Sequence, residues 1–191
     1  MSTATLVSVE DYLASGVKPT PEYREGILRP RSMPTLLHSL VQHFLVVLLR
    51  QMGLAAFQEL TVRLSGTRYL VPDIVVAERF EGDYPSTPPE ICIEILSPGD
   101  RPGTLAKCEE YHAWGVPYCW VIDPVAAVAW EYHKGQGPVH VDRSGTLHAG
   151  AVGVQMDELF RLVEAERRPR SPEVADVAST GIASGMPTIR E

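Results

Sequence analysis

The sequence predicts an α/β (α+β) fold, with a mixed β-sheet as its core and helices flanking that sheet. Apolar segments of strand length alternate with helical segments only in the middle of the chain, whereas the segments nearer both ends are typical of short antiparallel strands. With 191 residues, of which 45% are hydrophobic, the chain can form one domain with a proper core. We expect this domain over residues 1–166 and a disordered tail over residues 167–191, where Ser, Pro, Gly and Thr accumulate.

The first half of the chain predicts two helices separated by a hairpin. Ser8 can cap a short helix over residues 7–15, and Thr35 can open a long helix that ends near Gly53. Apolar residues recur at helical spacing in the long helix, so we expect it to be largely buried. The strands expected here are a pair within residues 23–31, one over residues 60–64, and one over residues 69–77 with Pro72 near its start.

The second half predicts two core strands with a helix between them. The strands cover residues 90–96 and 118–122, and the helix runs from about residue 104 to residue 114, where Gly115 follows it. Residues 128–132 and 139–141 are expected to form a further antiparallel pair, and residues 156–166 a final short helix.

Composition narrows the possible functions and locations. A net charge of -7 argues against a protein that coats nucleic acid by bulk attraction, because neutralising phosphates requires Lys and Arg. A nuclease remains compatible, since the acids of a metal site add negative charge. Cys92, Cys108 and Cys119 are odd in number and lack metal-ligand spacing, so we expect reduced thiols and a cytoplasmic protein. Neither a secretory signal nor a membrane-spanning segment is expected.

Three charged residues contradict their apolar surroundings. Glu94 lies in the middle of a strand of Ile, Cys and Leu, where a carboxylate is unfavourable unless it is paired or binds a metal. Asp73 stands at the entry of another apolar strand. Lys107 shares one face of its predicted helix with Tyr111 and Trp114, so this face is expected to turn inward. Taken singly, Asp73 could be an ordinary acid at a strand start, and Lys107 could extend to solvent.

Together, two carboxylates on neighbouring core strands and a lysine from the next helix suit the hydrolysis of a phosphodiester. Carboxylate oxygens bind Mg²⁺, and Mn²⁺ can substitute for it. We expect Asp73 and Glu94 to bind one such ion, with the backbone carbonyl of Ile95 as a third ligand. Lys107 could then orient the attacking water or stabilise the transition state.

A set of motifs is spread through the middle of the chain: Val71-Pro72-Asp73, Glu94-Ile95-Leu96-Ser97-Pro98, Lys107, Tyr111, Gly115-Val116-Pro117 and Trp120-Val121-Ile122-Asp123-Pro124. These motifs resemble the Uma-two family, a group of bacterial proteins labelled as restriction endonucleases in the PD-(D/E)xK nuclease superfamily. The resemblance runs from about Tyr23 to Phe160 and is most specific between Pro89 and Pro124.

The resemblance implies a restriction-endonuclease-like nuclease domain over residues 1–166, with Asp73 and Glu94 as the acids of the motif. The superfamily places its lysine two residues after the second acid, where this chain has Leu96, and Lys107 on the next helix matches the relocated lysine of the family. The family also carries an acid and a His upstream, which resemble Glu25 and His38. His38 could instead cap or pack in its helix.

Two classes of function therefore compete. The complete set of two acids and a lysine favours an Mg²⁺-dependent endonuclease that acts on DNA, with RNA or a branched structure as other substrates. The acidic charge and the lack of a DNA-reading motif favour a non-catalytic binding or regulatory protein on the same fold. A homodimer is expected from the reaction alone and not from particular residues, because cutting both strands of a duplex usually needs two sites.

Overall fold

The computed structural model describes residues 6–97 and 101–168, and its largest element is a six-stranded sheet. Strands β7 (Ile91–Ile95) and β8 (Tyr118–Asp123) are parallel and every other pair in this sheet is antiparallel, so the predicted mixed sheet is confirmed. Two parallel neighbouring strands need a crossover connection, and helix α3 (Arg101–Trp114) lies in this connection. In sheet order the strands are β10 (Val139–Val141), β9 (Val128–His133), β8 (Tyr118–Asp123), β7 (Ile91–Ile95), β6 (Ile74–Ala77) and β3 (Ala55–Gln58).

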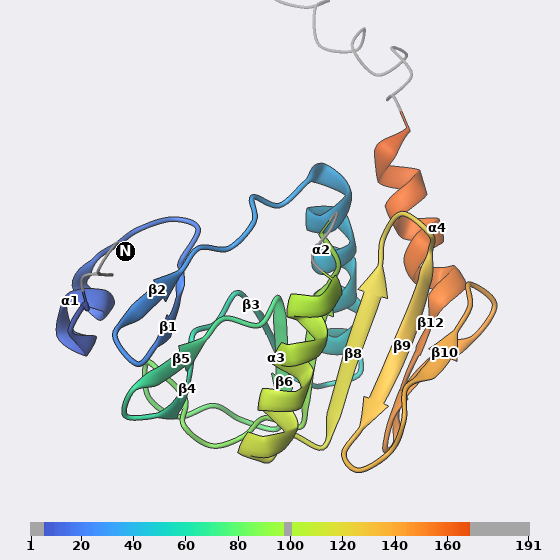
Figure 1. Ribbon diagram of the computed structural model, residues 1–191. Coiled ribbons are helices and arrows are strands. Elements are labelled where there is room, and N and C mark those ends of the chain that lie inside the picture. The colour runs from blue at the N-terminus through green and yellow to red at the C-terminus, as the bar shows by residue number, and fades with distance from the viewer. Residues whose placement is uncertain (1–5, 98–100, 169–191) are drawn as a thin grey trace, which may run out of the picture.

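Two smaller sheets adjoin this one (Figure 1). The first contains the predicted hairpin, and its strands lie in the order β2 (Ile27–Arg29), β1 (Glu22–Arg24), β5 (Arg68–Leu70) and β4 (Val62–Ser65). The second is the hairpin of β11 (Thr146–Ala149) and β12 (Val152–Gln155), which the sequence did not indicate. Short helix α1 (Val9–Ala14) packs Tyr12 against Tyr23 and Tyr69 of the first small sheet.

Helices cover both faces of the main sheet, and strand alternation decides which residues face which helix. Helices α2 (Leu36–Gln51) and α4 (Met156–Arg167) pack on the face that carries Ile93 and Trp120. Helix α3 packs on the other face, against Cys92 and Val121. Glu94 is in phase with Cys92, so its side chain lies on the α3 face.

A break in the chain at Pro72 positions Asp73. The sequence predicted one strand over residues 69–77, but β5 ends at Leu70 and β6 begins at Ile74, and the two strands belong to different sheets. Proline has no N–H to donate to a strand ladder, so the ladder stops there. The Asp73 carbonyl accepts hydrogen bonds from the Gln42 side chain at 2.7 Å and from the Glu59 N–H at 3.1 Å. Asp73 is thus fixed at the junction of the two sheets.

The C-terminal helix ends at Arg167, so the first residue of the predicted tail is helical. Residues 169–191 lie outside the described residues, and the disordered tail stays a prediction. Within the part of the chain that the structure describes, no helix combines the length and hydropathy needed to cross a membrane.

Candidate active site

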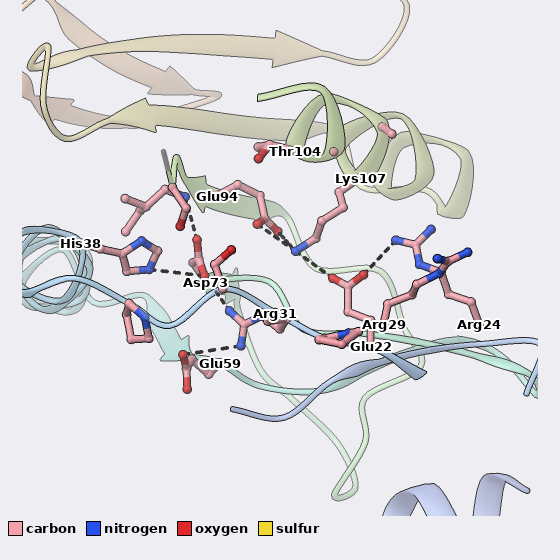
Figure 2. A pocket seen from close by; sticks show the side chains of 17 residues that line it. Glu22, Arg24, Arg29, Arg31, His38, Glu59, Asp73, Glu94, Thr104 and Lys107 are labelled. Atoms are coloured by element: carbon pink, nitrogen blue, oxygen red, sulfur yellow. Dashed lines mark hydrogen bonds and ion pairs between the residues drawn. The ribbon is translucent and has the colours of Figure 1, made fainter. Parts of the chain in front are cut away.

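A cavity of about 520 Å³ opens between the β1–β2 hairpin, the start of α2, the strands β6 and β7, and helix α3. Figure 2 shows that charged side chains from all of these elements meet in it. The structure brings four of the five predicted catalytic residues to this cavity, together with Ile95. The charged and histidine residues that line it are Glu22, Arg24, Arg29, Arg31, His38, Glu59, Asp73, Glu94 and Lys107.

Asp73 is held by contacts on both carboxylate oxygens and is only 4% exposed. Its Oδ2 accepts a hydrogen bond from the backbone N–H of Ile95 at 2.7 Å, and its Oδ1 accepts one from Arg31 at 2.7 Å. The His38 Nε2 atom lies 3.6 Å from the same Oδ1. Burial alone would raise the pKa of Asp73, but His38, Lys107 and Arg31 outweigh it and lower the pKa below its ordinary value.

Glu94 is buried beneath α3, with 5% of its surface exposed. Its Oε1 accepts a hydrogen bond from the Tyr111 hydroxyl at 2.7 Å, and its Oε2 accepts one from Lys107 at 2.9 Å. Burial nevertheless raises the pKa of Glu94 to about 7, because desolvation outweighs the attraction of Lys107 and the negative charge of Asp73 adds to it. This carboxyl group is therefore poised to gain or lose a proton near neutral pH.

Lys107 is the cation that the buried acids share. Its Nζ lies 2.8 Å from Glu94 Oε1 and 2.9 Å from Glu22 Oε1, and it donates a hydrogen bond to the Val71 carbonyl at 3.3 Å. Burial would lower the pKa of Lys107, but Glu94, Glu22 and Asp73 together raise it. The inward face predicted for Lys107 and Tyr111 is confirmed. Because several carboxylates share this one ammonium group, the negative charge of Glu94 is not fully neutralised.

Glu25, the remaining predicted residue, does not join the others. It lies in the β1–β2 turn with a φ of 47°, its side chain is 57% exposed, and it pairs with Arg68 at 2.8 Å. Glu22 occupies the cavity in its place. The turn signature of Glu25-Gly26 could have excluded Glu25, but the predicted strand pair within residues 23–31 left Glu22 outside it. The acid upstream of His38 that reaches this site is Glu22.

Arg31 is a site residue whose contacts the sequence did not reveal. It pairs with Asp73 at 2.7 Å and with Glu59 at 3.5 Å, and its side chain is largely buried. In the sequence, Arg31 is one of three arginines near Glu25, together with Arg24 and Arg29. Arg31 and Asp73 are 42 residues apart in the chain, so a sequence pattern alone cannot show that they form an ion pair.

The donor set of the cavity suits a hard divalent ion. Among residues 6–97 and 101–168, no three His, Cys, Asp or Glu side chains are arranged to hold a metal. Mg²⁺ does not require three, because it commonly binds through one or two carboxylates and keeps several waters. Asp73 and Glu94 supply two such groups, and the main chain of Ile95 lies against Asp73. The buried Glu94, incompletely neutralised by Lys107, also favours additional positive charge here.

Replacing Glu94 with glutamine should change how stability depends on pH in metal-free buffer. Folding raises the pKa of Glu94 from 4.5 to about 7, so the folded protein binds the proton more tightly and its stability falls as pH rises through that window. Glutamine cannot titrate. The stability of Glu94→Gln relative to wild type should therefore increase from about pH 5 to about pH 8, as measured by urea unfolding with chelator present. A difference that stays constant across this range would contradict the raised pKa.

Comparison with known proteins agrees with this fold. The sequence profile of the Uma2 family, described as "Putative restriction endonuclease", matches residues 9–168. The match covers most of the chain, and the chain belongs to this family, as its motifs predicted. No curated protein matches it.

A solved structure from Anabaena variabilis ATCC 29413, described as a putative nuclease belonging to DUF820, is similar with a TM-score of 0.71 and 23% sequence identity. The similarity covers 82% of this chain and 99% of that one. At this identity the likeness concerns the fold alone, and it agrees with the predicted α+β fold class.

Proposed function

We propose that this protein is an Mg²⁺-dependent endonuclease that hydrolyses phosphodiester bonds in DNA, with Mn²⁺ able to replace Mg²⁺. The observation that carries the proposal is the meeting of Asp73, Glu94 and Lys107 in one cavity, although they come from three separate elements. Membership in a family described as restriction endonucleases supports the same reaction class.

Asp73 and Glu94 would hold the ion. Bound there, Mg²⁺ would supply a Lewis acid that neutralises charge on the phosphate and acidifies a water. Arg31 and the Ile95 N–H fix the orientation of Asp73, and Tyr111 fixes that of Glu94. Lys107 would donate a hydrogen bond to a phosphate oxygen as negative charge develops on it.

A non-catalytic binding or regulatory protein on the same fold is the second candidate. One observation favours it: Asp73, Glu94 and Glu22 each already contact a cation of the protein itself. Such pairing would suffice to explain why these acids tolerate burial without any metal.

Plasmid cleavage separates the two candidates. The wild-type protein should convert supercoiled DNA to nicked or linear forms with Mg²⁺ or Mn²⁺ and should stop when a chelator is added. Linear product formed without a nicked intermediate would support the expected homodimer, in which two sites cut both strands. A parallel assay on labelled RNA tests that substrate. A folded protein that cuts no nucleic acid with either ion would favour the binding protein instead.

A further inference from the structure

Arg29 differs from the other charged residues of the cavity because it has no partner. Among the residues that the structure describes, each other charged side chain lining this cavity contacts an opposite charge. Arg24, for example, pairs with Glu22 and with Glu110. The side chain of Arg29 makes no hydrogen bond or ion pair with any described residue, although its backbone pairs with Glu22 in the hairpin.

The register of the hairpin explains why Arg29 stays free. Glu22 lies directly across from Arg29 in the β1–β2 pair, so both side chains lie on the face toward the cavity. Glu22 is nevertheless already engaged, since Oε2 contacts Arg24 at 2.9 Å and Oε1 contacts Lys107 at 2.9 Å. Arg24 and Lys107 thus already pair with Glu22, which is the acid that could otherwise neutralise Arg29. In Figure 2, Arg29 lies beside Arg24 at the end of the cavity opposite His38.

We infer that Arg29 binds a backbone phosphate of the nucleic-acid strand, next to the phosphodiester held by Asp73, Glu94 and Lys107. The inference rests on the proposed function and extends it to substrate positioning. A guanidinium group matches phosphate oxygens with two parallel N–H donors, and Arg29 can supply both because none is engaged by a described residue. Arg24 and Arg31 are less suited to this role, since they are held by acids.

The charge of the protein makes such a contact important. With a net charge of -7, the chain cannot attract nucleic acid by overall charge, so binding must depend on particular cations near the cavity. Each phosphate contact contributes about one unit to the dependence of the logarithm of affinity on the logarithm of salt concentration. Arg29 should therefore contribute to affinity and salt dependence but not to folding.

The test compares Arg29→Gln with Arg63→Gln in the full-length protein. Arg63 is an exposed arginine of the same small sheet, but it lies across from Tyr69, which packs with Tyr12 and Tyr23 away from the cavity. Binding to a fluorescent DNA duplex is measured by anisotropy at several salt concentrations, with Ca²⁺ in place of Mg²⁺ and the duplex checked for integrity. Arg29→Gln should weaken binding about tenfold and reduce the salt slope by about one, while Arg63→Gln changes neither.

A second Arg29 variant and a stability measurement distinguish a phosphate contact from an effect on folding. Arg29→Lys should recover the salt slope but only part of the affinity, because lysine keeps the charge and loses the paired donors. The melting temperatures of both Arg29 variants should equal that of wild type. If wild type binds and cuts DNA but Arg29→Gln binds like Arg63→Gln, the role of Arg29 is overturned and the proposed function stands. If wild type neither binds nor cuts, both are overturned.

Discussion

Replacing Lys107 with methionine is expected to lower the free energy of unfolding by about 3–5 kcal/mol at neutral pH. Lys107 lies within 2.9 Å of both Glu22 and Glu94, and its side chain is 14% exposed. Methionine preserves most of the apolar stem but leaves buried acids without their shared cation. Urea unfolding with chelator present measures the change.

Lys134→Met is the matched control, because Lys134 is exposed and forms no ion pair with a described residue. This variant should change stability by no more than about 0.5 kcal/mol. Equal stability of the two variants would mean that the acids tolerate burial without Lys107, which would contradict its role as their shared cation.

Asp73→Asn is expected to abolish measurable Mg²⁺ or Mn²⁺ binding and to reduce DNA cleavage by at least about 10³-fold. The amide is a poorer ligand than a carboxylate, and it also weakens the pairing with Arg31 that orients this group. Isothermal titration calorimetry with Mn²⁺ and a plasmid assay measure the two effects on the same preparation.

Asp157→Asn provides the control, since Asp157 also pairs with an arginine, Arg143 at 3.2 Å, but does so on the exposed surface of α4. It should bind the ion and cut like wild type. Cleavage by Asp73→Asn at the wild-type rate would reject the metal role, and loss of cleavage in both variants would point to a general effect of removing an acid.

The meeting of the three central residues of the candidate site was predictable because these residues conflict with their local surroundings. Glu94 within an apolar strand and Lys107 on the face of Tyr111 are visible as anomalies in the sequence, and the structure joins them at 2.8 Å. Asp73 precedes a fully buried strand. The sequence pattern did not reveal how Glu94 would be satisfied, and the structure provides both Lys107 and Tyr111 as partners.

Residues that reach the site through tertiary contacts were less predictable. Glu25 was predicted because the family pattern indicates an acid in this segment, whereas the structure places Glu25 in the turn and Glu22 on the cavity face of β1. Arg31 follows β2 in an irregular segment, so no periodicity indicates its direction. Its partnership with Asp73 depends on how the two sheets meet, which is a property of the whole fold.

Short strands account for most of the fold that the sequence did not predict. Strand β3 has four residues and pairs only at the sheet edge, while β11 and β12 form a hairpin of four residues each. Periodicity over four residues is too brief to separate a strand from a loop. Pro72 was placed within a single predicted strand, because the break between β5 and β6 becomes evident only when two sheets are known to be present.

A crystal soaked in Mn²⁺ and measured for anomalous scattering tests the central claim most directly. The account predicts one peak in the cavity, about 2.0–2.3 Å from a carboxylate oxygen of Asp73 and from one of Glu94. The same soak of Asp73→Asn should show no peak. The account would be contradicted by a wild-type map without a peak, in which Arg31 still contacts Asp73 and Lys107 still contacts Glu94, or by an ion that touches neither acid.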